Sequence, residues 1–93
     1  MIRHIVMWKF REGEAQKAEE FLSALAALQG VVPEIRSSRV VTNVAEGGYD
    51  AALIADFDSL AALEQYKNDP RHKAVSALCK SIRESRASVD YEL

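Results

Sequence analysis

The sequence predicts an α+β domain in which four strands form one antiparallel sheet and helices cover a single face of it. Apolar residues recur at every second position in four segments and about every 3.6 positions in the segments between them. These segments follow one another in the order β-α-β-β-α-β, which is the ferredoxin-like pattern. With 93 residues the chain is long enough for one hydrophobic core, so we expect a single domain over residues 1–93.

The first expected strand covers residues 2–10, and both of its faces carry apolar side chains. Alternation separates the side chains into two sets: Ile2, His4, Val6, Trp8 and Phe10 on one face, and Arg3, Ile5, Met7 and Lys9 on the other. The β-branched and aromatic residues among them favour a strand. Two partly apolar faces are typical of a central strand that is covered on both sides.

We expect the first helix over residues 14–29, after Gly13 ends the alternation. Apolar side chains then follow the spacing of one helix face: Ala18, Phe21, Leu22, Leu25 and Leu28. Gly30 suits the position that follows a helix C-terminus, and Pro33 prevents any long continuation.

Two further strands are expected at residues 37–44 and 49–57. They flank Glu46-Gly47-Gly48, the clearest turn signal in the chain, so a hairpin is the simplest arrangement. One face of the later strand is apolar: Tyr49, Ala51, Leu53, Ala55 and Phe57.

A second helical region begins at Leu60 and is interrupted at Asp69-Pro70, where an acid can cap a new helix that has proline at its first position. The apolar spacing continues as far as Ile82, and the last expected strand covers residues 88–93. The three basic residues of the intervening segment are therefore placed on a solvated helix surface: Lys80, Arg83 and Arg86.

The charge balance excludes some classes of partner. Twelve basic and fourteen acidic residues give a formal net charge of −2, without the basic stripe of a nucleic-acid binder or a polybasic membrane surface. No apolar run approaches the ~20 residues that span a bilayer, and no secretory signal is visible. The lone Cys79 cannot form an internal disulfide. We expect a small cytoplasmic domain that binds neither nucleic acid nor membranes.

The sheet face opposite the helices has to meet water or a partner. It carries Ile5 and Met7 on the first strand, with Ala52 and Ile54 on the third, and charged residues flank both pairs. An apolar centre with a charged rim suits a homodimer built through this face. A solvated sheet with scattered apolar residues is the alternative.

Three side chains are candidates for chemistry. His4 is expected to point into the layer between sheet and helices, and Tyr66 belongs to the buried stripe of the second helical region. His72 lies in the first turn after Pro70, where the helix dipole favours a neutral imidazole that can act as a general base. For each of the three, plain packing or a satisfied core position is the alternative.

The direction of Asp90 depends on which face of the last strand points inward. Simple alternation places Val89, Tyr91 and Leu93 inward and Asp90 in solvent.

The sequence shows no metal-binding motif. The potential metal ligands His4, His72, Cys79 and Asp90 have no short ligand spacing, so no metal is expected. No other cofactor is expected either.

Several short segments together resemble the stress-responsive A/B barrel (Dabb) domain family. They are residues 2–10 and 49–53, Phe57 with Leu63 and Tyr66, residues 69–72 and residues 90–92, in family order over essentially the whole chain. The resemblance implies ferredoxin-like subunits that pack sheet to sheet into a dimeric α/β barrel.

The resemblance also implies roles for single residues. In a polyketide cyclase branch of the family, the catalytic positions match His4, Tyr66 and His72, and Asp90 matches an acid near the histidines. On that basis Asp90 faces the helices, while Val89 and Tyr91 face the dimer. The bulky lining of the cyclase pocket is reduced here, since Ala24 and Ala51 are small and Arg83 replaces a tryptophan. A plant polyketide substrate is therefore not expected.

Three functions stay open at this point. The first is a cofactor-free enzyme acting on a small carbonyl (polyketide-like) substrate, with His72 as base, Tyr66 as donor to the developing oxyanion and His4 as a polar anchor. The second is a non-catalytic stress-response or small-ligand-binding dimer. The third, by analogy of fold, is a cofactor-free oxygenase. A cavity bordered by both histidines would favour the first or the third, and a filled core would favour the second.

Overall fold

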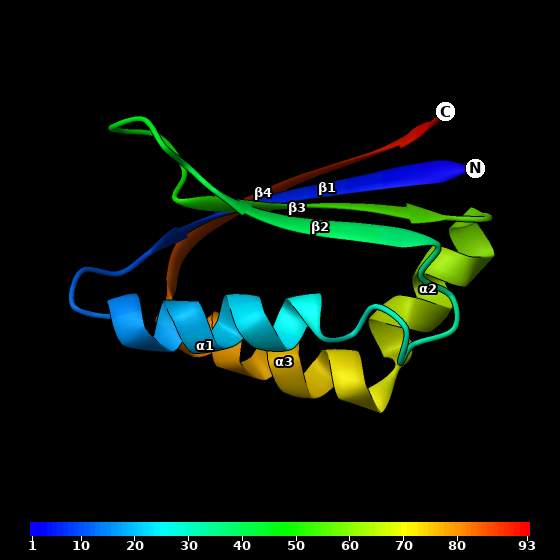
Figure 1. Cartoon of the computed structure of the whole chain (residues 1–93), viewed down its shortest axis with the longest axis horizontal. Helices are drawn as coiled ribbons and strands as arrows, with labels where there is room; N and C mark the ends of the chain where they lie inside the picture. Colours follow the sequence, from blue (N-terminus) through cyan, green and yellow to red (C-terminus); the bar gives the residue numbers. More distant parts are fainter.

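The computed structural model describes residues 1–93 and has two layers, a four-stranded antiparallel sheet and three helices on one of its faces (Figure 1). This arrangement confirms the predicted ferredoxin-like α+β fold. The elements in chain order are β1 (Ile2–Phe10), α1 (Ala15–Ala26), β2 (Ser37–Thr42), β3 (Ala51–Phe57), α2 (Leu60–Asn68), α3 (Pro70–Ile82) and β4 (Arg83–Glu92).

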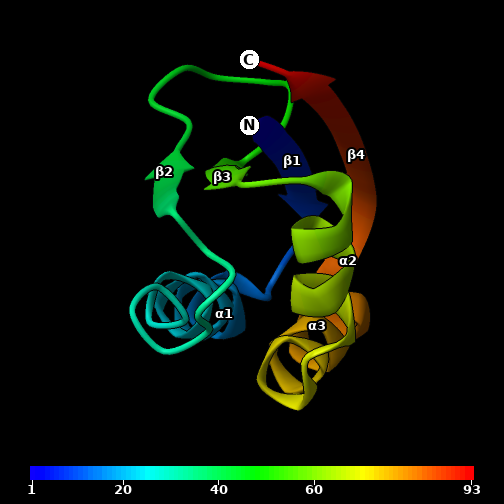
Figure 2. The same cartoon turned by 90° about the vertical axis from the view of Figure 1, so that its right-hand side faces the viewer.

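The sheet has the strand order β2-β3-β1-β4, so β1 is central, as its two apolar faces predicted. It pairs with β3 on one side, where His4 is opposite Ala55, and with β4 on the other, where His4 is opposite Asp90. Strands β2 and β3 form the expected hairpin. All helices lie on one face of the sheet, and no helix covers the opposite face in either view (Figures 1 and 2).

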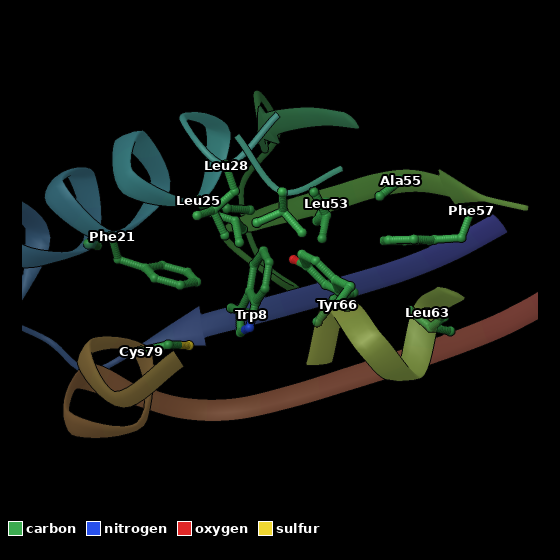
Figure 3. Packing of buried hydrophobic residues seen from close by; sticks show 14 of the residues in the cluster. Trp8, Phe21, Leu25, Leu28, Leu53, Ala55, Phe57, Leu63, Tyr66 and Cys79 are labelled. Carbon is green, nitrogen blue, oxygen red and sulfur yellow. The ribbon is translucent and has the colours of Figure 1, made fainter. Parts of the chain in front are cut away.

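The core lies between the inner sheet face and the helices. Helix α1 lies below the β2 and β3 side of the sheet, while α3 lies below the β1 and β4 side (Figure 2). Trp8 of β1 packs edge to face against Phe21 of α1, with ring centroids 5.1 Å apart. Both side chains, together with Leu25 and Tyr66, point into the space between the layers (Figure 3).

The break between α2 and α3 is where the sequence predicted it. Ser59 caps α2 by accepting a hydrogen bond from the backbone N–H of Ala62. Asp69 caps α3 by accepting from the backbone N–H of Arg71, and Pro70 occupies the first turn, where no N–H partner is needed. The chain therefore changes direction between Tyr66 and His72, which places their two rings side by side.

The last strand begins five residues earlier than predicted. Ile82 ends α3, and Arg83 already has extended backbone angles (φ −81°, ψ 142°) and is opposite Phe10 of β1. The placement of Arg83 and Arg86 on a helix surface was therefore wrong, because α3 passes into β4 without a connecting loop. The other boundaries are shorter than predicted: α1 ends at Ala26, β2 ends at Thr42, and β3 starts at Ala51.

The outer sheet face carries a row of apolar side chains across three strands. Ile54 of β3 is opposite Ile5 of β1, which in turn is opposite Val89 of β4. Beside this row, Arg3 donates two hydrogen bonds to the carboxylate of Asp56, at 2.8 and 3.0 Å. None of the helices is both long and apolar enough to cross a membrane.

Candidate active site

A cavity of about 50 Å³ lies between the inner sheet face and helices α1 and α3. Its lining combines apolar and polar side chains: His4, Val6, Trp8, Phe21, Leu25, Leu53, Tyr66, His72, Val75, Ser76, Cys79, Arg83 and Arg86. A cavity that accommodates benzene has about 150 Å³, so this one holds only a few non-hydrogen atoms. His4, Tyr66 and His72 are thus brought together on one small space.

His4 is held by Asp90, its direct neighbour across the sheet. The Nδ1–H of the buried His4 ring donates a hydrogen bond to a carboxylate oxygen of Asp90. Burial lowers the pKa of His4, and this effect exceeds the opposing pull of the Asp90 carboxylate. The ring is therefore neutral, and its Nε2 atom carries the lone pair.

Asp90 itself does not line the cavity but lies behind His4 on the same sheet face. Val89 and Tyr91, with exposed fractions of 53% and 41%, point to the opposite face. The expectation from simple alternation was wrong because it took these two side chains as buried. The direction implied by the family resemblance is the observed one.

His72 is oriented by the broken helix. In an uninterrupted helix the carbonyl of Lys67 would accept from the backbone N–H of Arg71, but that N–H donates to Asp69 instead. The free Lys67 carbonyl lies 3.3 Å from Nδ1 of His72. Because a carbonyl oxygen can only accept, Nδ1 must carry the hydrogen, and Nε2 carries the lone pair. Burial lowers the pKa of His72, so the ring is a neutral base at pH 7.

Tyr66 presents a protonated hydroxyl to the same space. Its ring lies 4.3 Å from that of His72 and 5.0 Å from that of Phe57, measured between centroids. Burial raises the pKa of Tyr66 to about 12. The hydroxyl forms no hydrogen bond within the chain. Every fully buried polar side-chain atom has a hydrogen-bond partner, so the hydroxyl is not fully buried and reaches the cavity. Figure 3 shows it pointing toward the centre of the layer, beside Trp8.

Arg83 and Arg86 are the functional candidates that sequence reasoning missed. Both lie on β4 and line the cavity. The length of the first strand could have indicated them, because nine paired residues of β1 need a partner strand longer than the six residues predicted for β4.

The cavity adjoins a wider hollow, which we call the vestibule. Its volume is about 320 Å³, and it is lined by His4, Lys67, His72, Ser76, Lys80, Arg83 and Arg86. Five of these residues also line the cavity, so the two spaces are neighbours. No apolar and no acidic side chain lines the vestibule.

Together these groups provide a neutral imidazole with a free Nε2, a phenol that can donate a hydrogen bond, and a second oriented imidazole, all beside apolar walls. This set meets the requirements of proton abstraction next to a carbonyl group. No group of three or more metal-ligating side chains is present. The catalytic roles of His72, Tyr66 and His4 stay predictions, as does the absence of a cofactor.

The fold and the site define a small ferredoxin-like protein with a cavity between its sheet and its helices, in which two histidines and a tyrosine meet apolar walls. The chain belongs to the stress-responsive A/B barrel domain family, since the model of that family matches residues 2–93. A curated relative, an uncharacterised protein of Streptomyces coelicolor, is 30% identical over 97 residues, covering 99% of each chain.

Solved structures with the same fold include a dimeric protein of unknown function from Bacteroides fragilis. It is 30% identical, with a TM-score of 0.85, covering 99% of this chain and 95% of that one. A hydroxynitrile lyase from Passiflora edulis has a TM-score of 0.87 over 99% of this chain and 92% of its own. At 17% identity the lyase shows the shared fold alone.

Proposed function

We propose that this protein is a cofactor-free enzyme that removes a proton from the carbon next to the carbonyl group of a small substrate. The observation that carries the proposal is the pairing of His72 and Tyr66 on one cavity, with ring centroids 4.3 Å apart. One is a neutral base, and the other is a hydrogen-bond donor without a partner in the chain.

In the proposed step, Nε2 of His72 takes the proton, and the electron pair of the broken C–H bond forms the enolate. Negative charge then develops on the former carbonyl oxygen, where the Tyr66 hydroxyl donates a hydrogen bond. The Nδ1–H of His72 continues to donate to the Lys67 carbonyl, so the ring keeps its orientation when it becomes an imidazolium. His4, fixed by Asp90, serves as a second polar anchor.

The size of the cavity restricts the reacting part of the substrate. About 50 Å³ accommodates a carbonyl group with one or two neighbouring carbons, and the rest of the molecule has to extend into the vestibule. The small volume disfavours a long polyketide. A non-catalytic ligand-binding dimer or a cofactor-free oxygenase could use the same cavity, but proton abstraction by itself already gives His72 and Tyr66 separate tasks.

The test is hydrogen exchange in D₂O, followed by the loss of the methyl signals of pyruvate and its neutral analogue pyruvamide in ¹H NMR. We expect the wild-type protein to accelerate exchange of at least one probe, and His72→Gln to reduce the rate by about 10²–10⁴-fold, the usual contribution of a general base. Lys73→Gln, on the exposed side of α3, is the control and should match the wild type. No acceleration with either probe, or equal rates in wild type and His72→Gln, would overturn the proposal.

We also propose that two copies assemble through the outer sheet face. The row formed by Ile54, Ile5 and Val89 gives that face an apolar centre, and the Arg3–Asp56 pair lies beside it. The similar protein from Bacteroides fragilis is described as dimeric. In such a dimer β1 would be covered on both sides, as its two apolar faces predict.

A further inference from the structure

We propose that the substrate is an anion, a small oxo carboxylate whose carboxylate lies in the vestibule against Arg83 and Arg86 while its carbonyl end enters the cavity. The carbonyl half of this inference rests on the proposed function, whereas the anion site can be tested separately.

The charge of the vestibule is one-sided. Lys67, Lys80, Arg83 and Arg86 line it, four of the twelve basic residues of a chain whose net charge is −2. None of the four forms an ion pair within the chain. Two carboxylates act electrostatically on the histidines, Asp90 on His4 and Asp69 on His72. Both already form hydrogen bonds within the chain, Asp90 with His4 and Asp69 with Arg71. An anionic group of a ligand would therefore meet four cations without a competing carboxylate.

A local irregularity of β4 brings both arginines to the same face. Residues three positions apart on a regular strand point to opposite faces. Here the register shifts between Lys9 and Phe10 of β1, so that Arg83 is opposite Phe10 and Arg86 is opposite Trp8, both on the inner face. Such bulges re-aim side chains and are over-represented beside active sites. The two guanidinium groups, with their planar sets of donors, suit a carboxylate.

Arg86 also acts electrically on the reacting groups. Its positive charge lowers the pKa of His4, Tyr66, His72 and Cys79, although burial is the larger influence on each. The same charge would stabilise a bound carboxylate and the negative oxygen that develops on proton removal. One residue thereby connects substrate binding in the vestibule with chemistry in the cavity.

The dimensions of the two spaces fit a molecule with a small uncharged end and a charged end. The cavity of about 50 Å³ has apolar walls from Val6, Leu53 and Val75, while the vestibule of about 320 Å³ has no apolar lining. A short oxo acid places its carbonyl and its carboxylate only one or a few bonds apart, which matches two adjoining spaces.

The binding test is a ¹H–¹⁵N NMR titration of the whole protein with pyruvate and with pyruvamide, which has the same shape but no charge. We expect pyruvate to bind at least about tenfold more tightly at low salt, a difference of about 1.4 kcal/mol, and to weaken as salt is added. Arg86→Gln should reduce pyruvate affinity by about tenfold or more, and Lys80→Gln by a few-fold. The matched controls Arg11→Gln and Lys73→Gln carry the same charge change outside the vestibule and should bind as the wild type does.

The outcomes separate the two proposals. If pyruvate and pyruvamide bind equally, or if neither Arg86→Gln nor Lys80→Gln weakens pyruvate binding, the anion site is overturned, whatever the exchange rates are. If pyruvate binds through Arg86 but His72→Gln leaves exchange unchanged, the proposed function fails and the anion site stands. The Lys80 variant keeps the test decisive if Arg86→Gln does not fold.

Discussion

His4 donates a hydrogen bond from Nδ1 to the carboxylate of Asp90, although the two residues lie 86 positions apart in the sequence. The contact exists because the first and last strands of the chain are neighbours in the sheet and these two residues are directly opposite each other. It holds the buried imidazole in one tautomer and joins β4 to the centre of the sheet.

We expect Asp90→Asn to lower the free energy of unfolding by about 1–2 kcal/mol, because the buried ring keeps a hydrogen-bond partner but loses a charged one. Urea denaturation at pH 7 measures the change. Asp58→Asn is the control: Asp58 pairs with Arg36 in solvent, where the loss of free energy of unfolding should be smaller because water screens the pair. Equal losses of free energy of unfolding in the two variants would show that the His4–Asp90 hydrogen bond stabilises the fold no more than a surface ion pair does.

The protein should lose stability as the pH falls below about 6.5. Burial lowers the pKa of His4 and His72 from 6.5, so the unfolded chain takes up these protons before the folded one does. The unfolded state then binds more protons, and the free energy of unfolding decreases as the pH falls. Carboxylates whose pKa is lowered from 3.8, such as Asp56 and Asp69, lose their stabilising contribution only at lower pH.

Denaturation curves between pH 7.5 and 5 test this expectation. His72→Gln removes one of the two groups, so its stability should decline less steeply over that range than the stability of the wild type. The same steep decline in both proteins would contradict the assignment to His72.

Much of the fold could be predicted from the sequence because its signals are local. The alternation in residues 2–10, the helical spacing from Ala18 to Leu28 and the Asp69-Pro70 break each reflect interactions within a few residues. His4 and Tyr66 could be placed in the core layer for the same reason, since each shares a face with apolar neighbours.

The remainder of the site depends on pairing between distant segments. Arg83 and Arg86 reach the inner face only because β4 begins directly at the end of α3 and shifts its register against β1. Neither event has a strong local signal. The direction of Asp90 likewise follows from its pairing with His4, whereas alternation alone gave the opposite answer.

We expect Ile54→Asp to weaken self-association more than it disturbs the fold of the subunit. Ile54 lies on the outer sheet face beside Ile5, so a carboxylate there would be buried without a partner in the proposed dimer but solvated in the monomer. Sedimentation should show a dimer for the wild type at tens of micromolar and a monomer for the variant. Leu60→Asp, which replaces an exposed apolar residue at the start of α2, should stay dimeric. A monomeric wild type at that concentration would contradict the dimer.

Tyr66→Phe separates packing from chemistry at the cavity. The hydroxyl forms no hydrogen bond within the chain, and the ring packs between Phe57 and His72 in a way that phenylalanine can reproduce. The free energy of unfolding should therefore change by less than about 1 kcal/mol, because no buried partner is left unsatisfied.

The same substitution removes the only phenolic donor that the cavity offers to a developing oxyanion. We expect the exchange rate of the bound probe to fall by about 10²–10³-fold, the usual cost of losing one such donor. Because the pKa of Tyr66 is about 12, the wild-type rate should show no loss on the alkaline side up to pH 9, while its acidic limb should follow the lowered pKa of His72. A variant as active as the wild type, or one that loses stability and activity together, would assign Tyr66 to packing alone.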